Sequence, residues 1–179
     1  DNRPELLEEL GFAGRDPDTI GDGELLHAAF ARWGADCAAH LLGDFSFVLW
    51  DPRGRRLFAA RDAMGVRPFY YHFSPGRLFA FASEADALLQ VRGVPTDLDE
   101  GRIADALVQQ LEGIDKTSTF FRAVRRLPQA NTLLISGERL DCREYWTPMA
   151  AVPSGLPTTE SDWIEGLREH LTTAVKRRL

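Results

Sequence analysis

Three pairs of short apolar segments, each joined by a turn rich in proline or glycine, constrain the fold more than any other feature of the sequence. In the first pair, residues 45–50 and 56–61 flank a turn in which Pro52 fixes φ and Gly54 permits unusual values. The other pairs are 68–73 with 78–82, around Pro75 and Gly76, and 131–135 with 140–145, around Gly137. This pattern predicts three β-hairpins and therefore antiparallel sheet.

Helical segments are expected around these hairpins. Residues 22–33 place their apolar side chains on one helical stripe and end before Gly34, which suits the C′ position of a helix. Shorter helices are predicted at 2–10 with Asn2 as N-cap, at 37–42, from Ser83 to 89, and from Asp97 or Asp99 to 111. The first two hairpins are apolar almost throughout, which is typical of strands covered on both faces. The prediction is an α+β fold with helices on both sides of the sheet or sheets, the strand order being left open.

Composition and charge narrow the function classes. The 179 residues are 44% hydrophobic and 27% charged, as in a globular chain, and carry a net charge of −6, which argues against a nucleic-acid-binding module. Two cysteines, Cys37 and Cys142, are too few for a disulfide framework. No apolar run of membrane-spanning length and no signal peptide is seen. The expected location is the cytoplasm, with no membrane partner.

The ends of the chain suggest a piece of a longer protein. There is no initiator methionine, and the last predicted helix, 159–179, stops without a glycine or proline terminator. A proline-rich stretch at 147–158 reads as a linker between this helix and a domain at 1–146. The apolar stripe of the last helix is expected to pack either on a partner domain or on the chain's own sheets.

Four charged residues lie beside apolar strands: Arg61, Asp62, Arg67 and Glu84. Gly65 and the proline that follows Arg67 predict a tight, irregular excursion between the first two hairpins. Charges in such a place need partners. They are expected to pair with one another or with loop backbone, and direct contact with a substrate is the alternative.

Five strings together resemble the class II glutamine amidotransferase domain of asparagine synthetases. They are LLGDFSFVLWD at 41–51, RLFAARDAMGVRPFYY at 56–71, FASEADALL at 81–89, TFFRAVRRLP at 119–128 and REYW at 143–146. The resemblance implies the N-terminal-nucleophile sandwich, in which two antiparallel sheets lie between helical layers. It also implies that glutamine is attacked by an N-terminal cysteine and that an Asn-Gly pair stabilises the oxyanion. Both would lie before residue 1, so the fold is expected to be truncated at its N-terminus, with no catalytic residue in this chain and no glutaminase activity unaided.

One family binding position falls within the chain. The string GDGE at 21–24 resembles the family motif SDTE, whose aspartate binds the α-amino group of glutamine, and the matching residue is Asp22. Glycines replace the serine and threonine of that motif. The alternative is that Asp22 is only the N-cap of the helix at 22–33.

Other reactive residues give weaker signals. Cys37 has no base at a fixed spacing and is expected to be a buried thiol rather than a nucleophile. The four histidines form no metal-ligand spacing, so no metal and no cofactor is expected in this chain. No phosphate-binding glycine loop occurs. The resemblance assigns ATP and magnesium to an absent synthetase domain beyond the last helix, which would be the connector to it.

Two function classes follow from the resemblance. In the first, the full-length enzyme takes ammonia from glutamine and passes it to an ATP-activated carboxylate, most simply aspartate. In the second, the domain is a structural part of a diverged relative, such as a lasso-peptide cyclase or a β-lactam synthetase, and has lost glutaminase activity. The string DNRPEL at 1–6 and GDGE in place of SDTE favour the second class. Glutamine, the protein's own synthetase domain and a second copy in a homodimer are the partners under consideration.

Overall fold

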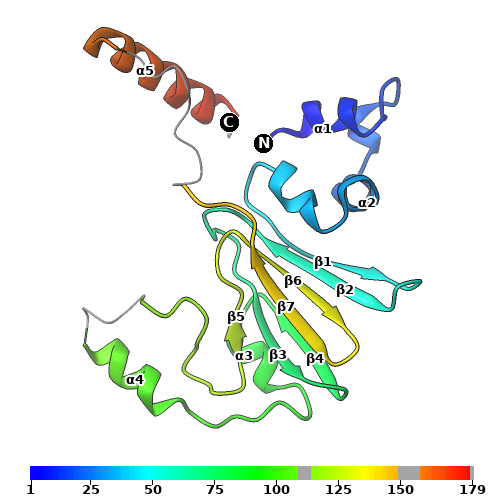
Figure 1. Cartoon of the computed structure of the whole chain (residues 1–179), viewed down its shortest axis with the longest axis vertical. Helices are drawn as coiled ribbons and strands as arrows, with labels where there is room; N and C mark the ends of the chain where they lie inside the picture. Colours follow the sequence, from blue (N-terminus) through cyan, green and yellow to red (C-terminus); the bar gives the residue numbers. More distant parts are fainter. Residues whose placement is uncertain (109–113, 149–157, 178–179) are drawn as a thin grey trace.

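The computed structural model describes residues 1–108, 114–148 and 158–177. It is a layered sandwich in which two antiparallel sheets are covered by helices on their outer faces (Figure 1). The predicted α+β class, with two sheets between helical layers, is confirmed.

The larger sheet has four strands in the order β1-β2-β6-β7. Its strands are β1 (Ser46–Asp51), β2 (Arg56–Arg61), β6 (Asn131–Ser136) and β7 (Arg139–Glu144). The smaller sheet has the order β4-β3-β5, with β3 (Tyr70–Ser74), β4 (Leu78–Ala82) and β5 (Arg125–Arg126). All three predicted hairpins are present, whereas the two-residue β5 was not predicted.

Successive side chains of β2 point to opposite faces of the sheet, so this strand contributes to two hydrophobic cores. Ala59 points between the sheets, where it packs with buried Leu133, Leu127 and Phe69. Phe58 points to the opposite face, toward α2 (Asp22–Trp33) and η2 (Gly34–His40). Both faces of this sheet are therefore covered, which explains its nearly continuous apolar strands.

The outer face of the smaller sheet is covered by α3 (Ala85–Leu89), whose Leu88 is buried against Val124 and the strands β3 and β4. Ser83 was expected to cap this helix, but Glu84 occupies the N-cap position and makes no side-chain cap bond. Asp99 caps α4 (Glu100–Leu107), as predicted, by accepting from the backbone N–H of Arg102. The described α4 ends at Leu107, with Val108 as its C-cap, which is short of the predicted end at residue 111; that residue itself lies outside the described residues.

The N-terminal segment forms α1 (Arg3–Glu9), followed by the short helix η1 (Pro17–Thr19). Asn2 occupies the predicted N-cap position, but its side chain does not cap the helix. Its amide donates to the carbonyl of His40 and accepts from the N–H of Leu42, both at 2.9 Å. These two bonds fasten α1 to the loop that follows η2.

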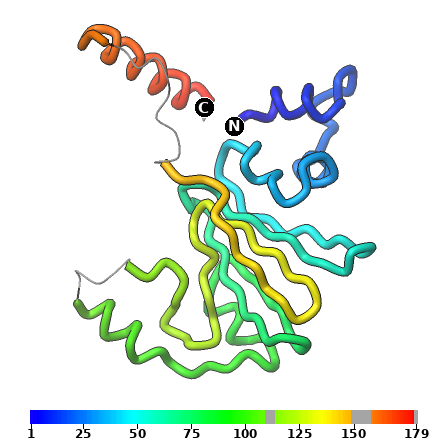
Figure 2. Tube along the Cα trace, viewed as in Figure 1, coloured from blue at the N-terminus to red at the C-terminus, as the bar shows by residue number. Residues whose placement is uncertain are grey.

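The last helix, α5 (Glu160–Lys176), begins at the predicted place, and Thr159 caps it. None of its residues is buried, and Trp163, Leu167 and Leu171 of its apolar stripe are each more than half exposed. Of the two alternatives for this stripe, packing on the chain's own sheets is therefore not seen for the described residues. The C-terminal end of α5 lies beside α1, where Arg177 and Glu5 form an ion pair at 3.2 Å (Figure 2). No helix in the described part of the chain is long and apolar enough to cross a membrane.

The charged excursion after β2 is held by backbone contacts, as predicted. The carboxylate of Asp62, 1% exposed, accepts from the N–H groups of Val66 and Arg67 at 2.9 Å each. The guanidinium of Arg61 donates to the carbonyls of Gly65, Arg67 and Leu127 at 2.6, 2.8 and 2.7 Å. Burial lowers the pKa of Arg61, and the nearby Asp62 charge opposes that effect. These two residues therefore fix the path of the chain between the sheets.

Replacement of Asp62 by asparagine tests this interpretation. The amide nitrogen cannot accept one of the two backbone N–H bonds, so the free energy of unfolding should fall by about 2–4 kcal/mol. Urea denaturation measures the change. The control is Asp141→Asn on the exposed strand β7, for which a change within about 0.5 kcal/mol is expected. Equal effects of the two substitutions would contradict the assigned role of Asp62.

Candidate functional site

A pocket of about 280 Å³ lies where the start of the chain, the beginning of α2 and the loop after η2 come together. It is lined by Asp1, Asn2, Arg3, Leu6, Asp22, Leu25, Leu26, Leu41, Leu42, Gly43, Asp44 and Phe45. Its floor is apolar and its rim carries charges of both signs. This combination suits a small zwitterionic molecule better than a purely apolar ligand.

Close backbone contacts set one wall of the pocket. The backbone nitrogen of Asp1 donates to the carbonyl of Leu42 at 2.6 Å. Gly43 has φ +132°, and a Cβ there would lie 3.1 Å from the Asp1 nitrogen. A larger residue at this position would push the two segments apart, because the neighbouring atom is backbone. Gly43 therefore permits the close approach of residues 1 and 43.

Asp22 stands at the rim of this pocket, on the first turn of α2. The N-cap position is held by Gly21, and no side-chain cap bond is present, so the alternative interpretation of Asp22 as an N-cap is wrong. Gly21 has the extended backbone that a cap requires, and Asp22 already has helical geometry. Its carboxylate lies at the N-terminal end of α2.

The partner of Asp22 is Arg3, which sequence reasoning missed. Their side chains form an ion pair at 2.6 Å, and the exposed fractions are 35% for the arginine side chain and 90% for the aspartate side chain. Arg3 also donates to the carbonyl oxygens of Pro17 and Ile20, so the cation is fixed by the loop before α2. The two residues are nineteen positions apart, and no spacing pattern links them. Asp22 therefore presents an exposed carboxylate, one oxygen of which is bound by Arg3.

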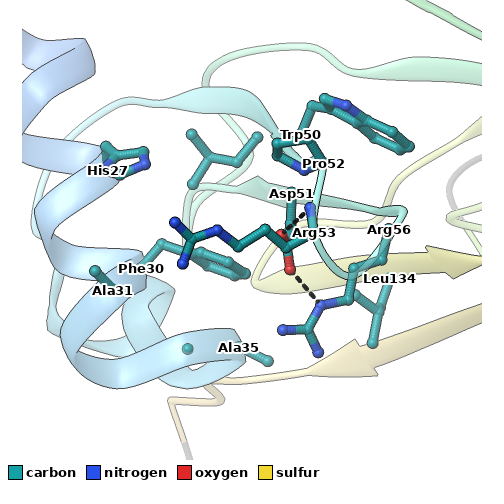
Figure 3. Close-up of a pocket in the computed structure, with 12 residues that line it drawn as sticks. His27, Phe30, Ala31, Ala35, Trp50, Asp51, Pro52, Arg53, Arg56 and Leu134 are labelled. Carbon is teal, nitrogen blue, oxygen red and sulfur yellow. Dashed lines mark hydrogen bonds and ion pairs between the residues drawn. The ribbon is translucent and has the colours of Figure 1, made fainter.

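A larger hollow, of about 620 Å³, lies between α2 and the β1–β2 hairpin (Figure 3). Its floor includes Phe30 and Leu134. The carboxylate of Asp51 accepts from the N–H groups of Arg53 and Gly54 and from Nε of Arg56 at 2.8 Å. The Gly54 N–H and the Arg56 bond lower the pKa of Asp51. Asp51 and Arg56 at this hollow thus stabilise the β1–β2 turn, and they do not point together toward a ligand site.

The other candidate residues from the sequence lie outside the pocket that contains Asp22. Cys37 is fully buried against α2 and β2, and burial raises the pKa of its thiol to about 11. The expectation of a buried thiol is confirmed, and its low reactivity stays a prediction. Within the described residues, no group of three His, Cys, Asp or Glu side chains is placed to hold a metal ion. Arg67 and Glu84 are exposed. The bond between Arg67 and Asp62 is made by the backbone N–H of Arg67 and not by its side chain.

The family is decided by comparison with known proteins. Residues 2–146 match the family described as glutamine amidotransferase domain. The chain belongs to this family. The match ends where the predicted linker begins, so it covers the sandwich and stops before α5.

Two relatives extend the likeness of this amidotransferase domain through α5. The asparagine synthetase (glutamine-hydrolyzing) 3 of Bacillus subtilis is 30% identical over 99% of the chain, which spans 28% of that protein. The amidase chyE of Penicillium rubens is 32% identical over 99% of the chain and 25% of its own length. The domain therefore spans only about a quarter of the curated relatives that it matches.

The fold has a counterpart among solved structures. The glutamine phosphoribosylpyrophosphate amidotransferase of B. subtilis, in complex with ADP and GMP, aligns with 82% of this chain and 27% of that one. The TM-score is 0.52 and the identity 18%, so the likeness concerns the fold. It agrees with the two-sheet sandwich of this amidotransferase domain.

The two cysteines of the domain should differ in reactivity. With a pKa of about 11, roughly 0.1% of Cys37 is thiolate at pH 8, and its burial also excludes reagents. Cys142 lies on the exposed strand β7. Under native conditions iodoacetamide should label Cys142 at least about tenfold faster, as measured by peptide mass spectrometry. Urea should abolish the difference, and equal native labelling rates would contradict the burial of Cys37.

Proposed function

We propose that this domain binds glutamine in the pocket at the start of α2 and, within the full-length protein, supplies its amide nitrogen to an asparagine-synthetase-like reaction. Membership of the amidotransferase family and the name of the bacterial relative support the glutamine substrate. The single observation that carries the site is the placement of Asp22, an exposed carboxylate on the rim of a pocket with an apolar floor.

Asp22 has the chemistry to receive the α-ammonium of glutamine. Its carboxylate is an acceptor of charge-assisted hydrogen bonds, and one oxygen, Oδ1, is the atom bound to Arg3. Arg3 is held by the loop carbonyls of Pro17 and Ile20, so it orients the carboxylate. The aliphatic part of glutamine would lie on Leu25 and Leu26, which line the same pocket. Asp22 is thus a binding residue, and Arg3 a positioning residue for it.

The connector role of α5 belongs to the same proposal. The family match ends at residue 146, whereas the relatives align through α5 and have most of their length outside the aligned part. Its exposed apolar stripe suits burial against a following synthetase domain. ATP and magnesium would be bound in that domain and would supply the activation of the carboxylate. The free Cys37 and Cys142 agree with a cytoplasmic protein.

A second candidate function is a structural domain without glutaminase activity, as in relatives that form an intramolecular amide. The observation in its favour is the Arg3–Asp22 ion pair, because Arg3 already neutralises the carboxylate that an ammonium group would need. In that case the pair serves only to tie α1 to α2. Lasso-peptide cyclases and β-lactam synthetases are the classes of protein that this alternative would fit.

Substitution of Asp22 by asparagine in the full-length protein separates the two functions. If Asp22 binds the ammonium, the glutamine-dependent turnover should fall about tenfold or more, since a charge-assisted contact is lost. Turnover with added ammonia should be unchanged. Steady-state kinetics with each nitrogen source measures both.

The chain offers a matched control on the same turn of helix. Glu24→Gln also removes an exposed first-turn acid with an arginine partner, here Arg15 at 2.5 Å. It should leave the turnover with either nitrogen source within about twofold of the wild type, because this pair lies outside the pocket. Equal glutamine-dependent turnover in the Asp22 and Glu24 variants would overturn the binding role of Asp22 and favour the structural domain.

A further inference from the structure

A third pocket is lined by residues of α4, α3, β3 and β5. In Figure 1, α4 lies at the opposite end of the molecule from α2. The volume of this pocket is about 230 Å³. The residues that matter for its chemistry are Tyr70, Asp86, Arg102, Thr119 and Arg126. We refer to it as the Arg102–Arg126 pocket.

Arg102 is brought to this pocket by the way α4 is anchored. The segment before α4 pairs with residues 120–122, through the bridge between Leu98 and Phe121. The N–H of Asp99 donates to the carbonyl of Phe120 at 2.8 Å, and the Asp99 side chain then caps α4. The third residue of α4 therefore points back toward the sheet, and Arg102 is only 7% exposed.

Arg126 is fixed from the opposite side by a tightly bonded loop. The hydroxyl of the buried Thr119 donates to the carbonyl of Val124 at 2.8 Å, and the N–H of Arg126 donates to the carbonyl of Thr117 at 2.7 Å. Asp115 accepts from the backbone of Thr117 and from the N–H of Ser118, and its hydrogen bonds to these two residues lower its pKa. The loop is thus ordered by its own polar contacts.

The two arginines are left with unused donors. Within the described residues, Nη1 of Arg102 and Nε of Arg126 are buried and have no hydrogen-bond partner. Neither arginine forms an ion pair with a described residue, although Asp86 lines the same pocket. Burial of a guanidinium with unpaired N–H groups is strongly unfavourable, so such a site is stabilised by an added acceptor.

The charge of the pocket also favours an added anionic acceptor. Two arginines and one aspartate line the pocket, so its formal charge is positive. Burial lowers the pKa of Arg61 at the end of β2, and the positive charge of Arg126 lowers it further. An anion would relieve this repulsion and satisfy the open donors at the same time.

We propose that the Arg102–Arg126 pocket binds a small oxyanion, either a carboxylate or a phosphate group. The planar guanidinium fork matches the oxygens of both groups. The pocket is lined by a nine-tenths buried arginine with an unpaired donor, and it is too small for a macromolecule. It is separate from the pocket that holds Asp22, so this site does not rest on the proposed function.

Thermal unfolding of the full-length protein in matched salts tests the site. At equal ionic strength, sodium phosphate or sodium acetate should raise the melting temperature above its value in sodium chloride, because an anion that binds only the folded state stabilises it. A response to phosphate alone or to acetate alone identifies the bound group. Isothermal titration with the responding salt then gives the dissociation constant.

Arg102→Met should weaken binding of the responding anion at least about tenfold. The matched control is Arg122→Met, which removes the same charge at an exposed position in the loop before β5 and should bind as the wild type does. If Arg102→Met fails to fold, Arg126→Gln takes its place in the same titration. The proposal is overturned if neither anion stabilises the wild type beyond chloride, or if the pocket variant binds as tightly as the control.

Discussion

The paired contacts of Arg61 and Asp62 hold the two sheets of this protein together. Arg61 ends a strand of the larger sheet, and its guanidinium reaches the carbonyl of Leu127, which follows β5 of the smaller sheet. Asp62 is buried, and its carboxylate accepts from the N–H groups of Val66 and Arg67 in the segment between the two sheets. The phenol of Tyr145 donates to the carbonyl of Arg61 at 2.9 Å, and burial raises the pKa of that phenol.

The candidate glutamine pocket depends on this junction through the backbone. The N–H of Asp62 donates to the carbonyl of Phe45 at 2.8 Å, and Phe45 lies at the end of the loop that lines the pocket. In the same loop, Leu42 accepts from the backbone nitrogen of Asp1 and donates to the side chain of Asn2. One end of the loop that lines the pocket is therefore bonded directly to Asp62.

Local patterns predicted the elements well and the site only in part. The hairpins could be predicted because a proline or glycine turn and flanking apolar residues lie within a few positions of one another. The two-residue β5 and the order β1-β2-β6-β7 could not, because they depend on pairings between distant segments. Asp22 was found through the likeness to the family motif, but its partner Arg3 and the Arg102–Arg126 pocket have no sequence pattern. The cap assigned to Asp22 failed because Gly21, without a side chain, takes that position.

The central claim is that this amidotransferase domain receives the α-ammonium of glutamine at Asp22. The most direct test is calorimetric titration of the full-length protein with L-glutamine and with 5-amino-5-oxopentanoate, the analogue that lacks only the α-amino group. The account predicts that glutamine binds at least about tenfold more tightly than the analogue, and that Asp22→Asn removes this preference. Equal affinities for the two compounds in the wild type would contradict it.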